Sequence, residues 1–489
     1  MQRSKNFQKR TRFTENYWKK VIMIDWPMHS SKTLRNLVFV GVALCLLSLI
    51  LLSERSEIDV GFFHRKLSVI SHKPLFPLDF QDVIGTILVS LGLLVAASGG
   101  IGGGGILVPL FILVFNFGPK HAVALSNFSI LATSLTNMLI NIPKRHPFAD
   151  RPLVDWDLIL VMEPLTMGGA VVGAIMSKLL PDWILVCSLV VLLAFTTWTT
   201  LEKGISQYKV ETKSFMAKVQ EEIQAKEENE PLMQEDLEEK SGTVDTPQGN
   251  NDLDELLKKE TVTPWDRVNS IILLVVVVTV LNLLKGGGSF PSPLGISCGS
   301  FWYWILTAAV FVWIFFIAWY MRAELIEKWK LKKRLNYKYL EGDVEWDPIS
   351  TLKYPFICVF AGFFAGLFGI GGGIVKGPLM LYMGVNPLVA SATCAVMIFF
   401  TSIAATTIFI AFGMLQFDYA VYFAVVGFIA TAIGQFGVSY LVKKYKRTSL
   451  VSLSIGAVVA ISTVLMSIQG IFDLVDDSAP QESTGLCTK

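Results

Sequence analysis

Two glycine-rich stretches could each present bare backbone N–H groups to a ligand. The first runs from Gly99 to Gly105 (GGIGGGG), and the second from Gly369 to Gly373 (GIGGG). A glycine run that opens a helix suits an anion, because the free N–H groups and the positive end of the helix dipole face the break. Gly100, Gly102 and Gly105 also fit the G-x-G-x-x-G spacing of dinucleotide-binding folds, which alone is a weak signal.

The residues around the first stretch argue against a dinucleotide site. Both flanks are long apolar runs, and position 125, where an acidic ribose-binding residue would fall, is leucine. Within a bilayer, non-helical backbone is tolerated only where it is buried in protein or lines a wet cavity. The two breaks therefore predict a cavity between two halves of a membrane protein. The alternative is that small residues merely let helices pack closely.

The two stretches belong to an internal duplication. Four residues separate Gly104 from Pro109 in the first copy and Gly373 from Pro378 in the second. Further matches follow in the same order, with gaps only where loops are expected, for example Asp157 with Asp418. Ordered matches of this kind predict two structural repeats.

Polar side chains in the helices after the two breaks are candidates to bind an anion. Hydroxyl and amide groups donate hydrogen bonds to oxyanions, although in membranes such groups also bridge helices. Thr133 and Ser391 are of this kind. The residues predicted to bind substrate are Gly100, Gly102, Gly103, Gly104, Ser126, Asn127, Gly369, Gly371, Gly372, Gly373, Lys376 and Thr393.

Two charged residues fall inside apolar runs, where a charge is costly and is therefore a functional candidate. Lys376 lies within one turn of the second break, and Leu107 takes the corresponding place in the first copy. We expect Lys376 to attract an anion; the alternative is a lysine that snorkels to the extracytoplasmic surface. Glu163 lies roughly 12 Å deep in its span and is the candidate carrier of a coupled proton. The alternative is a pairing with a neighbouring helix that only holds the fold.

The composition predicts an integral membrane protein. Of 489 residues, 52% are hydrophobic and 17% charged, and the mean hydropathy is +0.53, which leaves too little polar surface to enclose the apolar residues in water. The balance of 42 basic and 40 acidic residues argues against a nucleic-acid partner. The six cysteines show no metal-ligand spacing, so we expect neither a metal nor a cofactor.

Apolar runs and charge divide the chain. We expect an all-α, polytopic fold of two inverted repeats, each of about five helical segments with a glycine-rich break, plus an N-terminal span and two linking spans. The expected segments are a basic cytoplasmic N-terminus (1–36), a signal anchor or signal peptide (37–53), an extracytoplasmic segment (54–81), a first repeat (82–201), an acidic and largely disordered cytoplasmic loop (202–265), the linking spans (266–322), a basic interfacial segment (323–350), a second repeat (351–470) and a tail (471–489).

The positive-inside rule predicts the orientation. With a cytoplasmic N-terminus, the basic residues from Lys144 to Arg151, those from Lys328 to Arg334 and those at 443–447 all fall on the cytoplasmic side. This count requires the short segments 105–117 and 374–384 to carry the chain across. It sends the two repeats into the membrane from opposite sides. We expect a multi-pass protein of the plasma membrane or an endomembrane.

Several motifs resemble those of a known family. The two GIGGG motifs with their prolines, ALSNFSI after the first, ASATCAV after the second, KRHP and DWDLILVMEPL are similar to the TauE/SafE sulfite exporter family, also called toluene sulfonate uptake permeases, in its plant-type branch. The resemblance covers roughly residues 80–210 and 345–470. It implies a transporter of sulfite or organosulfur anions such as sulfonates, with the proton gradient as a candidate driving force.

The residues and the resemblance together favour a secondary transporter of a small sulfur-containing anion that works by alternating access, with a possible proton coupling. The expected partners are this anion and the lipid bilayer; the sequence predicts no oligomeric state. An alternative is a membrane scaffold or receptor whose cytoplasmic loops bind partners. We do not expect an enzyme, because no nucleophile with a base at a suitable spacing is present.

Overall fold

The computed structural model describes residues 73–98, 102–146, 149–228, 255–256, 258, 260–288, 290–337, 339–340 and 342–445, with short pieces between 453 and 467. Within these ranges the chain is helical; the β-structure there is one isolated bridge between Arg145 and Pro152. The expected span at 37–53 and most of the tail lie outside the described residues.

The helices follow the predicted apolar runs closely. Nine of them, among the residues described, are long and apolar enough to cross a membrane, so the prediction of an all-α, multi-pass membrane protein is confirmed. The helices are α3 (Phe80–Ser98), α4 (Gly104–Leu113), α5 (Pro119–Asn141), α6 (Trp156–Leu179), α7 (Asp182–Glu228), α9 (Trp265–Lys285), α10 (Phe301–Arg334), α11 (Ser350–Phe368), α12 (Gly373–Tyr382), α13 (Pro387–Ala411) and α14 (Phe417–Tyr445).

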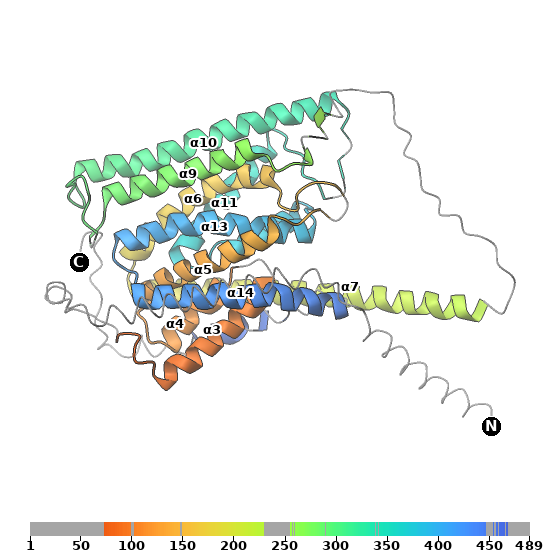
Figure 1. Ribbon diagram of the computed structural model, residues 1–489, viewed down its shortest axis with the longest axis horizontal. Coiled ribbons are helices and arrows are strands. Elements are labelled where there is room, and N and C mark those ends of the chain that lie inside the picture. The colour runs from red at the N-terminus through yellow and green to blue at the C-terminus, as the bar shows by residue number, and fades with distance from the viewer. Residues whose placement is uncertain are drawn as a thin grey trace.

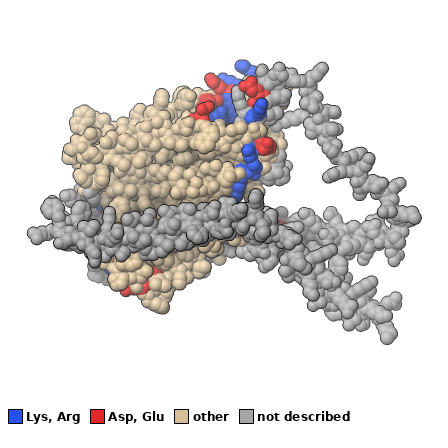
Figure 2. Space-filling model, in the orientation of Figure 1, with Lys and Arg blue, Asp and Glu red and all other residues tan. Residues whose placement is uncertain are grey.

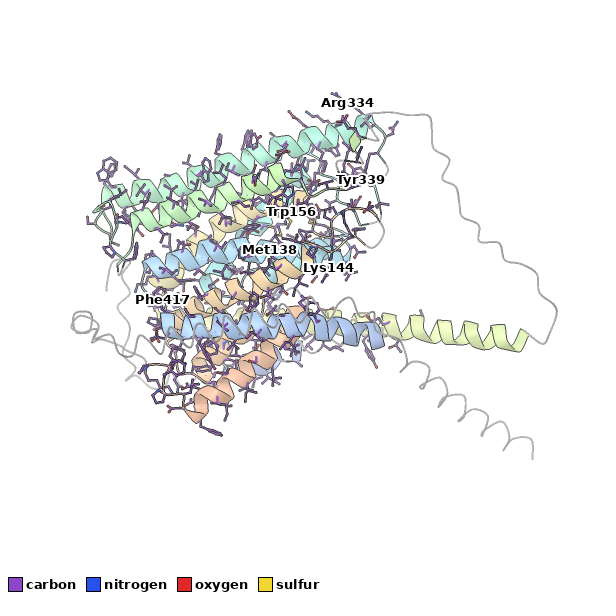
Figure 3. The ribbon with its side chains drawn as sticks, in the orientation of Figure 1. Met138, Lys144, Trp156, Arg334, Tyr339 and Phe417 are labelled. Carbon is purple, nitrogen blue, oxygen red and sulfur yellow. The ribbon has the colours of Figure 1, made fainter. Side chains whose placement is uncertain are left out.

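The long helices lie roughly along one direction, so the bundle has two ends (Figures 1 and 3). We name them the Lys144 end, where Trp156 and Arg334 also lie, and the Phe417 end (Figure 3). Helices α9 and α10 form one edge of the bundle, α3 and α4 lie at the other, and α5, α6, α11 and α13 fill the middle (Figure 1).

Helices α3 and α4 form a hairpin that opens toward the Phe417 end. Gln81, near the start of α3, donates a hydrogen bond to the carbonyl oxygen of Val114, just after α4, at 2.5 Å. The rings of Phe115 and Phe423 lie 5.0 Å apart, which places the end of α4 beside the start of α14. The chain therefore enters along α3, turns at the first glycine stretch and returns to the same end.

Helices α11 and α12 form a second hairpin, which opens toward the Lys144 end. A Cβ on Gly342, before α11, would lie 3.2 Å from the backbone nitrogen of Asn386, which lies between α12 and α13. Trp346 and Val389, which flank this hairpin, line one cavity together with Trp156. The two hairpins thus enter the bundle from opposite ends, while antiparallel duplication itself stays a prediction from the sequence.

The short helices α4 and α12 have ten residues each, about 15 Å at 1.5 Å per residue, or half of the hydrocarbon thickness. They do not cross a bilayer by themselves, but each returns the chain to the end where its hairpin began. The basic residues grouped by the sequence, around Lys144 and Arg334, accordingly lie at one end (Figure 3).

Small residues allow α6 and α11 to pack closely. A Cβ on Gly362 would lie 1.9 Å from the carbonyl oxygen of Thr166, and one on Gly173 would lie 2.1 Å from that of Phe363. Both helices carry glycines four residues apart, the spacing that permits backbone approach in membranes. This seam holds the middle of α6, which carries Glu163, against the second hairpin.

Two helices continue beyond the boundaries expected from the sequence. Helix α7 continues past position 201 to Glu228, so the first part of the expected acidic loop is helical; residues 229–254 lie outside the described ranges. Helix α10 runs unbroken to Arg334, so the start of the expected interfacial segment extends a spanning helix instead of forming a separate one. Both extensions are rich in lysine and glutamate, which favour helix without needing burial.

Candidate functional site

Both glycine stretches form tight turns at the tips of the hairpins. Gly102 and Gly103 adopt φ values of 81° and 76°, and Gly371 and Gly372 adopt 71° and 73°. Side chains other than glycine rarely adopt this left-handed region, so the glycines are required by the backbone as well as by space. Gly100 lies outside the described residues.

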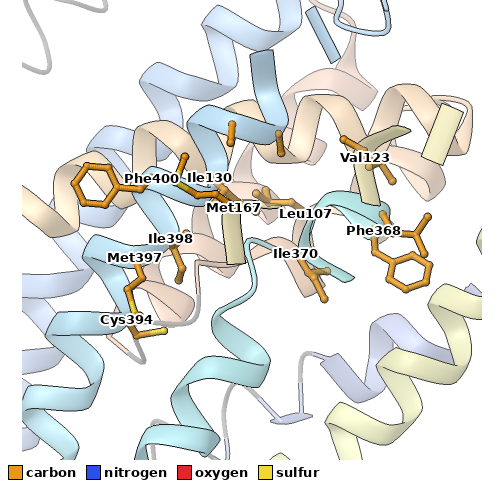
Figure 4. Close-up of a cluster of buried hydrophobic side chains, with 14 of the residues drawn as sticks. Leu107, Val123, Ile130, Met167, Phe368, Ile370, Cys394, Met397, Ile398 and Phe400 are labelled. Atoms are coloured by element: carbon orange, nitrogen blue, oxygen red, sulfur yellow. The ribbon is translucent and has the colours of Figure 1, made fainter. Parts of the chain in front are cut away.

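The two turns meet in the middle of the bundle. A Cβ on Gly104 would lie 2.4 Å from the Cα atom of Ile370 and 2.5 Å from the carbonyl oxygen of Gly369. The first residue of α4 therefore touches the backbone of the second turn. Figure 4 shows Ile370 and Leu107, from the two hairpins, in one buried cluster.

Two isoleucines lie against both turns. Positions for a Cβ on Gly102 and on Gly371 each fall 3.0–3.6 Å from side-chain atoms of Ile130 of α5 and Ile398 of α13. Ile130 and Ile398 are both buried (Figure 4). The two turns thus share an apolar contact. At the start of α4 and α12, the N–H groups of Ile106 and Val375 already bond to the carbonyl oxygens of Gly103 and Gly372, so only the first two N–H groups of each helix remain without an intrahelical acceptor.

Ser126 and Asn127, which follow the first break in the sequence, contact the second turn. The Ser126 hydroxyl donates to the carbonyl oxygen of Gly369 at 2.7 Å. A Cβ on Gly369 would lie 3.3 Å from Asn127 Nδ2, and the same nitrogen donates to the Val123 carbonyl at 3.3 Å. Helix α5, in the first half of the chain, therefore positions the tip of the hairpin in the second half.

The predicted residues Lys376 and Glu163 form a buried ion pair. Lys376 Nζ lies 2.8 Å from Glu163 Oε2, and both side chains are 0% exposed. Thr401 of α13 completes the cluster: its hydroxyl lies 2.8 Å from Lys376 Nζ and 2.6 Å from Glu163 Oε1. We call Glu163, Lys376 and Thr401 the central triad.

The central triad sits beside the second glycine turn. Lys376 belongs to the first turn of α12, and a Cβ on Gly372 would lie 3.6 Å from its Cε atom. Lys376 therefore points into the bundle and does not reach a surface, contrary to the snorkelling alternative. The sequence left two roles open for Glu163: a proton carrier, or a structural pairing with a neighbouring helix. Glu163 does pair with a neighbouring helix, and its partner is the lysine that we expected to bind an anion.

Thr401 was missed in the sequence because threonine is common in apolar helices. The signal that could have found it is the duplication, in which Thr401 takes the place of Thr133. Thr133 donates to the carbonyl of Ile130 at 3.0 Å, with Leu107 where the second half has Lys376. The first hairpin therefore has a leucine where the second hairpin has the lysine of the central triad.

Thr393, also predicted to bind substrate, contacts the chain just before α6. Its hydroxyl accepts a hydrogen bond from the backbone N–H of Asp155 at 3.0 Å, just before α6. The Asp155 carboxylate caps α6 by accepting from the N–H groups of Asp157 and Leu158. Burial, with the negative charge of Asp157 close by, raises the pKa of Asp155 to about 6.

A cavity of about 940 Å³ opens at the Lys144 end and is lined by ionic side chains. Asp157 pairs with Arg267 and, at 2.6 Å, with Lys328. Lys332 lies 2.7 Å from Glu260. Figure 2 shows the charged side chains gathered at this end, with an almost uncharged surface over the middle of the visible face.

These ion pairs tie α6 to α9, α10 and residue 260. Burial alone raises the pKa of Glu260, but the charges of Lys332 and Lys328 and the Tyr337 hydroxyl outweigh it and hold that pKa below its usual value. The network was missed in the sequence because its members are far apart along the chain and follow no periodicity.

A second, much smaller cavity lies between the two hairpins. It has a volume of about 50 Å³ and is lined by Gly103 and Gly105 from one hairpin, Ile374 and Pro378 from the other, and Thr196 of α7, among others. It has room for water but not for a large organic anion. The glycine turns are thus closed in this structure.

Comparisons with known proteins identify the family to which the sequence is similar. The family model described as "Sulfite exporter TauE/SafE" matches residues 28–199, 84–232 and 270–470. "Sulfite exporter TauE/SafE family protein 2" of Arabidopsis thaliana is 28% identical over 414 residues, covering 83% of this chain and 87% of that protein. Family protein 1 of the same plant is 27% identical over 398 residues, covering 81% and 85%. No solved structure matches the chain.

Proposed function

Since the chain belongs to the TauE/SafE sulfite exporter family, in agreement with a plant-type branch, we propose that it carries sulfite or an organosulfur anion such as a sulfonate across a membrane. The family is one of membrane transporters, not of enzymes. The proposal also covers three more specific points: the identity of the substrate, the coupling of its transport to protons, and an alternating-access mechanism.

The observation that carries the proposal is the central triad. A buried ammonium group beside a glycine turn provides the charge an anion needs, and the first-turn N–H groups of α12 provide hydrogen-bond donors. Lys376 and Thr401 together offer donors to one oxyanion. Gly102, Gly103 and Gly104 of the first hairpin would face the same anion once the two tips separate.

The triad also suggests how protons are coupled. Lys376 and Glu163 are neutral as a pair, and breaking a buried pair leaves a costly unpaired charge. A singly charged anion that takes the place of Glu163 beside Lys376 leaves the carboxylate alone, unless Glu163 takes up one proton. In this proposal the anion and the proton enter together, and one elementary charge of each sign moves in each cycle.

The two hairpins suggest the moving parts. They enter from opposite ends and meet at their tips, as expected of inverted repeats that alternately open one side of the membrane. Lys376 has Leu107 as its counterpart, so the charge is confined to the second hairpin. We propose that the separation of the tips opens the closed site.

The orientation is proposed from charge and cysteine chemistry. The Lys144 end carries the basic residues and would face the cytoplasm. Cys298, in the connection between α9 and α10 at the opposite end, is disulfide-bonded, which suits an oxidising compartment. Both observations favour an N-terminus on the cytoplasmic side.

Flux into proteoliposomes tests the proposal. We expect purified protein to transport sulfite above empty liposomes, with a rate that an imposed pH gradient changes. The Gly103→Leu, Gly372→Leu double variant should lose the flux, because leucine is strained at positive φ. Gly377→Leu is the matched control, since a Cβ there meets nothing within 4 Å. Absence of flux for sulfite, sulfate and simple sulfonates, from protein shown to be folded, would favour the scaffold alternative.

A further inference from the structure

A second buried lysine lies in a different part of the bundle. Lys285 ends α9 near the Phe417 end and is 2% exposed. Its Nζ atom lies 3.5 Å from the Thr307 hydroxyl of α10 and 5.3 Å from the centre of the Tyr303 ring. Unlike Lys376, it has no carboxylate within ion-pair distance among the residues that the structure describes.

Unpartnered polar atoms surround this lysine. Asn282, one helical turn before Lys285 on the same face of α9, is fully buried, and neither its amide nitrogen nor its amide oxygen has a hydrogen-bond partner. The hydroxyl of Tyr303, whose side chain is 1% exposed, likewise has none. Buried polar atoms are almost always paired, so this concentration calls for an occupant.

Helix α13 contributes another buried polar atom without a hydrogen-bond partner. A Cβ on Gly287, just after α9, would lie 2.2 Å from the carbonyl oxygen of Ala411 at the end of α13. Asn282 lies five residues before Gly287, and Thr406 lies five residues before Ala411. Because α9 and α13 run in the same direction (Figure 1), Asn282 and Thr406 lie at the same level of the bundle. The Thr406 hydroxyl is buried and also unpartnered.

We propose that Asn282, Lys285, Tyr303 and Thr307, with Thr406 beside them, form a second anion site that takes a small oxyanion. The ammonium group supplies the charge, and the amide and hydroxyl groups supply hydrogen-bond donors. The amide oxygen of Asn282 accepts from a water or from a protonated oxygen of the anion. The near-complete burial limits the occupant to an inorganic anion or to the phosphate of a lipid.

The site is independent of the proposed transport site. It lies on α9, α10 and the end of α13, outside the two hairpins, and uses no residue of the central triad. It provides a counter-ion for a buried ammonium group whose recorded contacts are a hydroxyl and an aromatic ring. An anion that binds only the folded protein raises its stability. Once the anion concentration exceeds Kd, the gain in stability grows with the logarithm of that concentration.

Thermal unfolding of the full-length protein with sulfate tests this site. Sulfate is titrated at constant ionic strength in neutral detergent, after removal of lipid, and the melting temperature is recorded. We expect Lys285→Met to raise the apparent Kd for sulfate at least tenfold and Lys285→Arg to retain binding. Lys353→Met, which removes an exposed lysine of α11, is the control and should leave the sulfate-dependent shift unchanged.

Asn282→Leu provides a second variant, which keeps the charge and should weaken sulfate binding by about tenfold. Native mass spectrometry of protein from nanodiscs with phosphatidylglycerol distinguishes the source of the anion. Anionic lipid that is retained by the wild type and lost in Lys285→Met assigns the site to a lipid phosphate. An unchanged sulfate shift in both variants, with no lipid difference and folded protein by gel filtration, would overturn the proposal.

Discussion

Lys376 of α12 and Glu163 of α6 are 213 residues apart in the chain and 2.8 Å apart in the structure. Neither side chain reaches the surface. The pair joins the glycine hairpin of the second half to a helix of the first half, next to the place where both hairpins meet. Any movement of α12 away from α6 must therefore separate two opposite charges or replace one of them.

The strength of this pair can be measured by a double-variant cycle. Lys376→Met and Glu163→Gln should each lower stability by about 3–5 kcal/mol, because each leaves a buried partner without its counterpart. The double variant should lose much less than the sum of the two. Apparent melting temperatures in detergent give the comparison, with Lys353→Met, at an exposed lysine of α11, as control. Simple additivity would contradict a direct pairing.

Thr401 is expected to position the pair. Thr401→Val keeps the shape and removes the hydroxyl that contacts both charges, so we expect sulfite flux to fall by about tenfold, the equivalent of one charge-assisted hydrogen bond. Thr401→Ser keeps the hydroxyl and should retain most of the flux. Thr133→Val, at the corresponding place without a charged neighbour, is the matched control. Equal losses at both threonines would mean that the hydroxyl at 401 only supports its helix.

Because the hairpin tips touch, we expect position 104 not to tolerate a residue larger than glycine. Gly104→Ala places a Cβ 2.4 Å from the Cα atom of Ile370, and backbone cannot yield cheaply, so we expect a loss of about 1–3 kcal/mol or more. Gly377→Ala, inside α12 with open space around it, should be neutral or stabilising by about 0.5–1 kcal/mol. Melting temperatures of the two variants should therefore shift in opposite directions. If Gly104→Ala did not lower the melting temperature, the tips would have to lie further apart than in this structure.

Much of this arrangement could be predicted from the sequence. Runs of apolar residues predicted the spanning helices, because hydrocarbon leaves few alternatives to helix, and the repeated glycines predicted two breaks of similar form. The residue pairs could not be predicted. Nothing in the local pattern connects Lys376 with Glu163, or Ser126 with Gly369, since these contacts arise only when the hairpins pack.

The same limit applies to charge. The basic residues near Lys144 and Arg334 were expected on one side from a counting rule, but their partners, such as Asp157 for Lys328, depend on how α6, α9 and α10 meet. Thr393 shows a related limit: its polar side chain predicted a ligand contact, and nothing in the sequence pattern indicated that its hydroxyl accepts a hydrogen bond from the backbone N–H of Asp155. A hydroxyl in an apolar helix does not by itself reveal which role it has.

The capping carboxylate of α6 should respond to pH. Because the pKa of Asp155 is raised to about 6 in the folded protein and is ordinary when unfolded, the folded state binds the proton more tightly. The contribution of this group to stability therefore falls as the pH rises from about 4 to 6 and is constant above. Asp155→Asn, which keeps a capping oxygen, should gain in melting temperature relative to the wild type at pH 7.5. That gain should become smaller at pH 5 and disappear near pH 4. A constant difference would contradict the raised pKa.

The most direct test of the central claim is a count of the protons that accompany each anion. Methanesulfonate is suitable because its charge does not change near neutral pH, so any proton taken up belongs to the protein. In proteoliposomes loaded with a pH-sensitive dye, the wild type should carry about one proton with each methanesulfonate, while Glu163→Gln should exchange the anion without protons and Lys376→Met should lose transport. Anion flux in the wild type without protons, or proton-coupled flux that persists in Glu163→Gln, would contradict the exchange of an anion for Glu163 at Lys376.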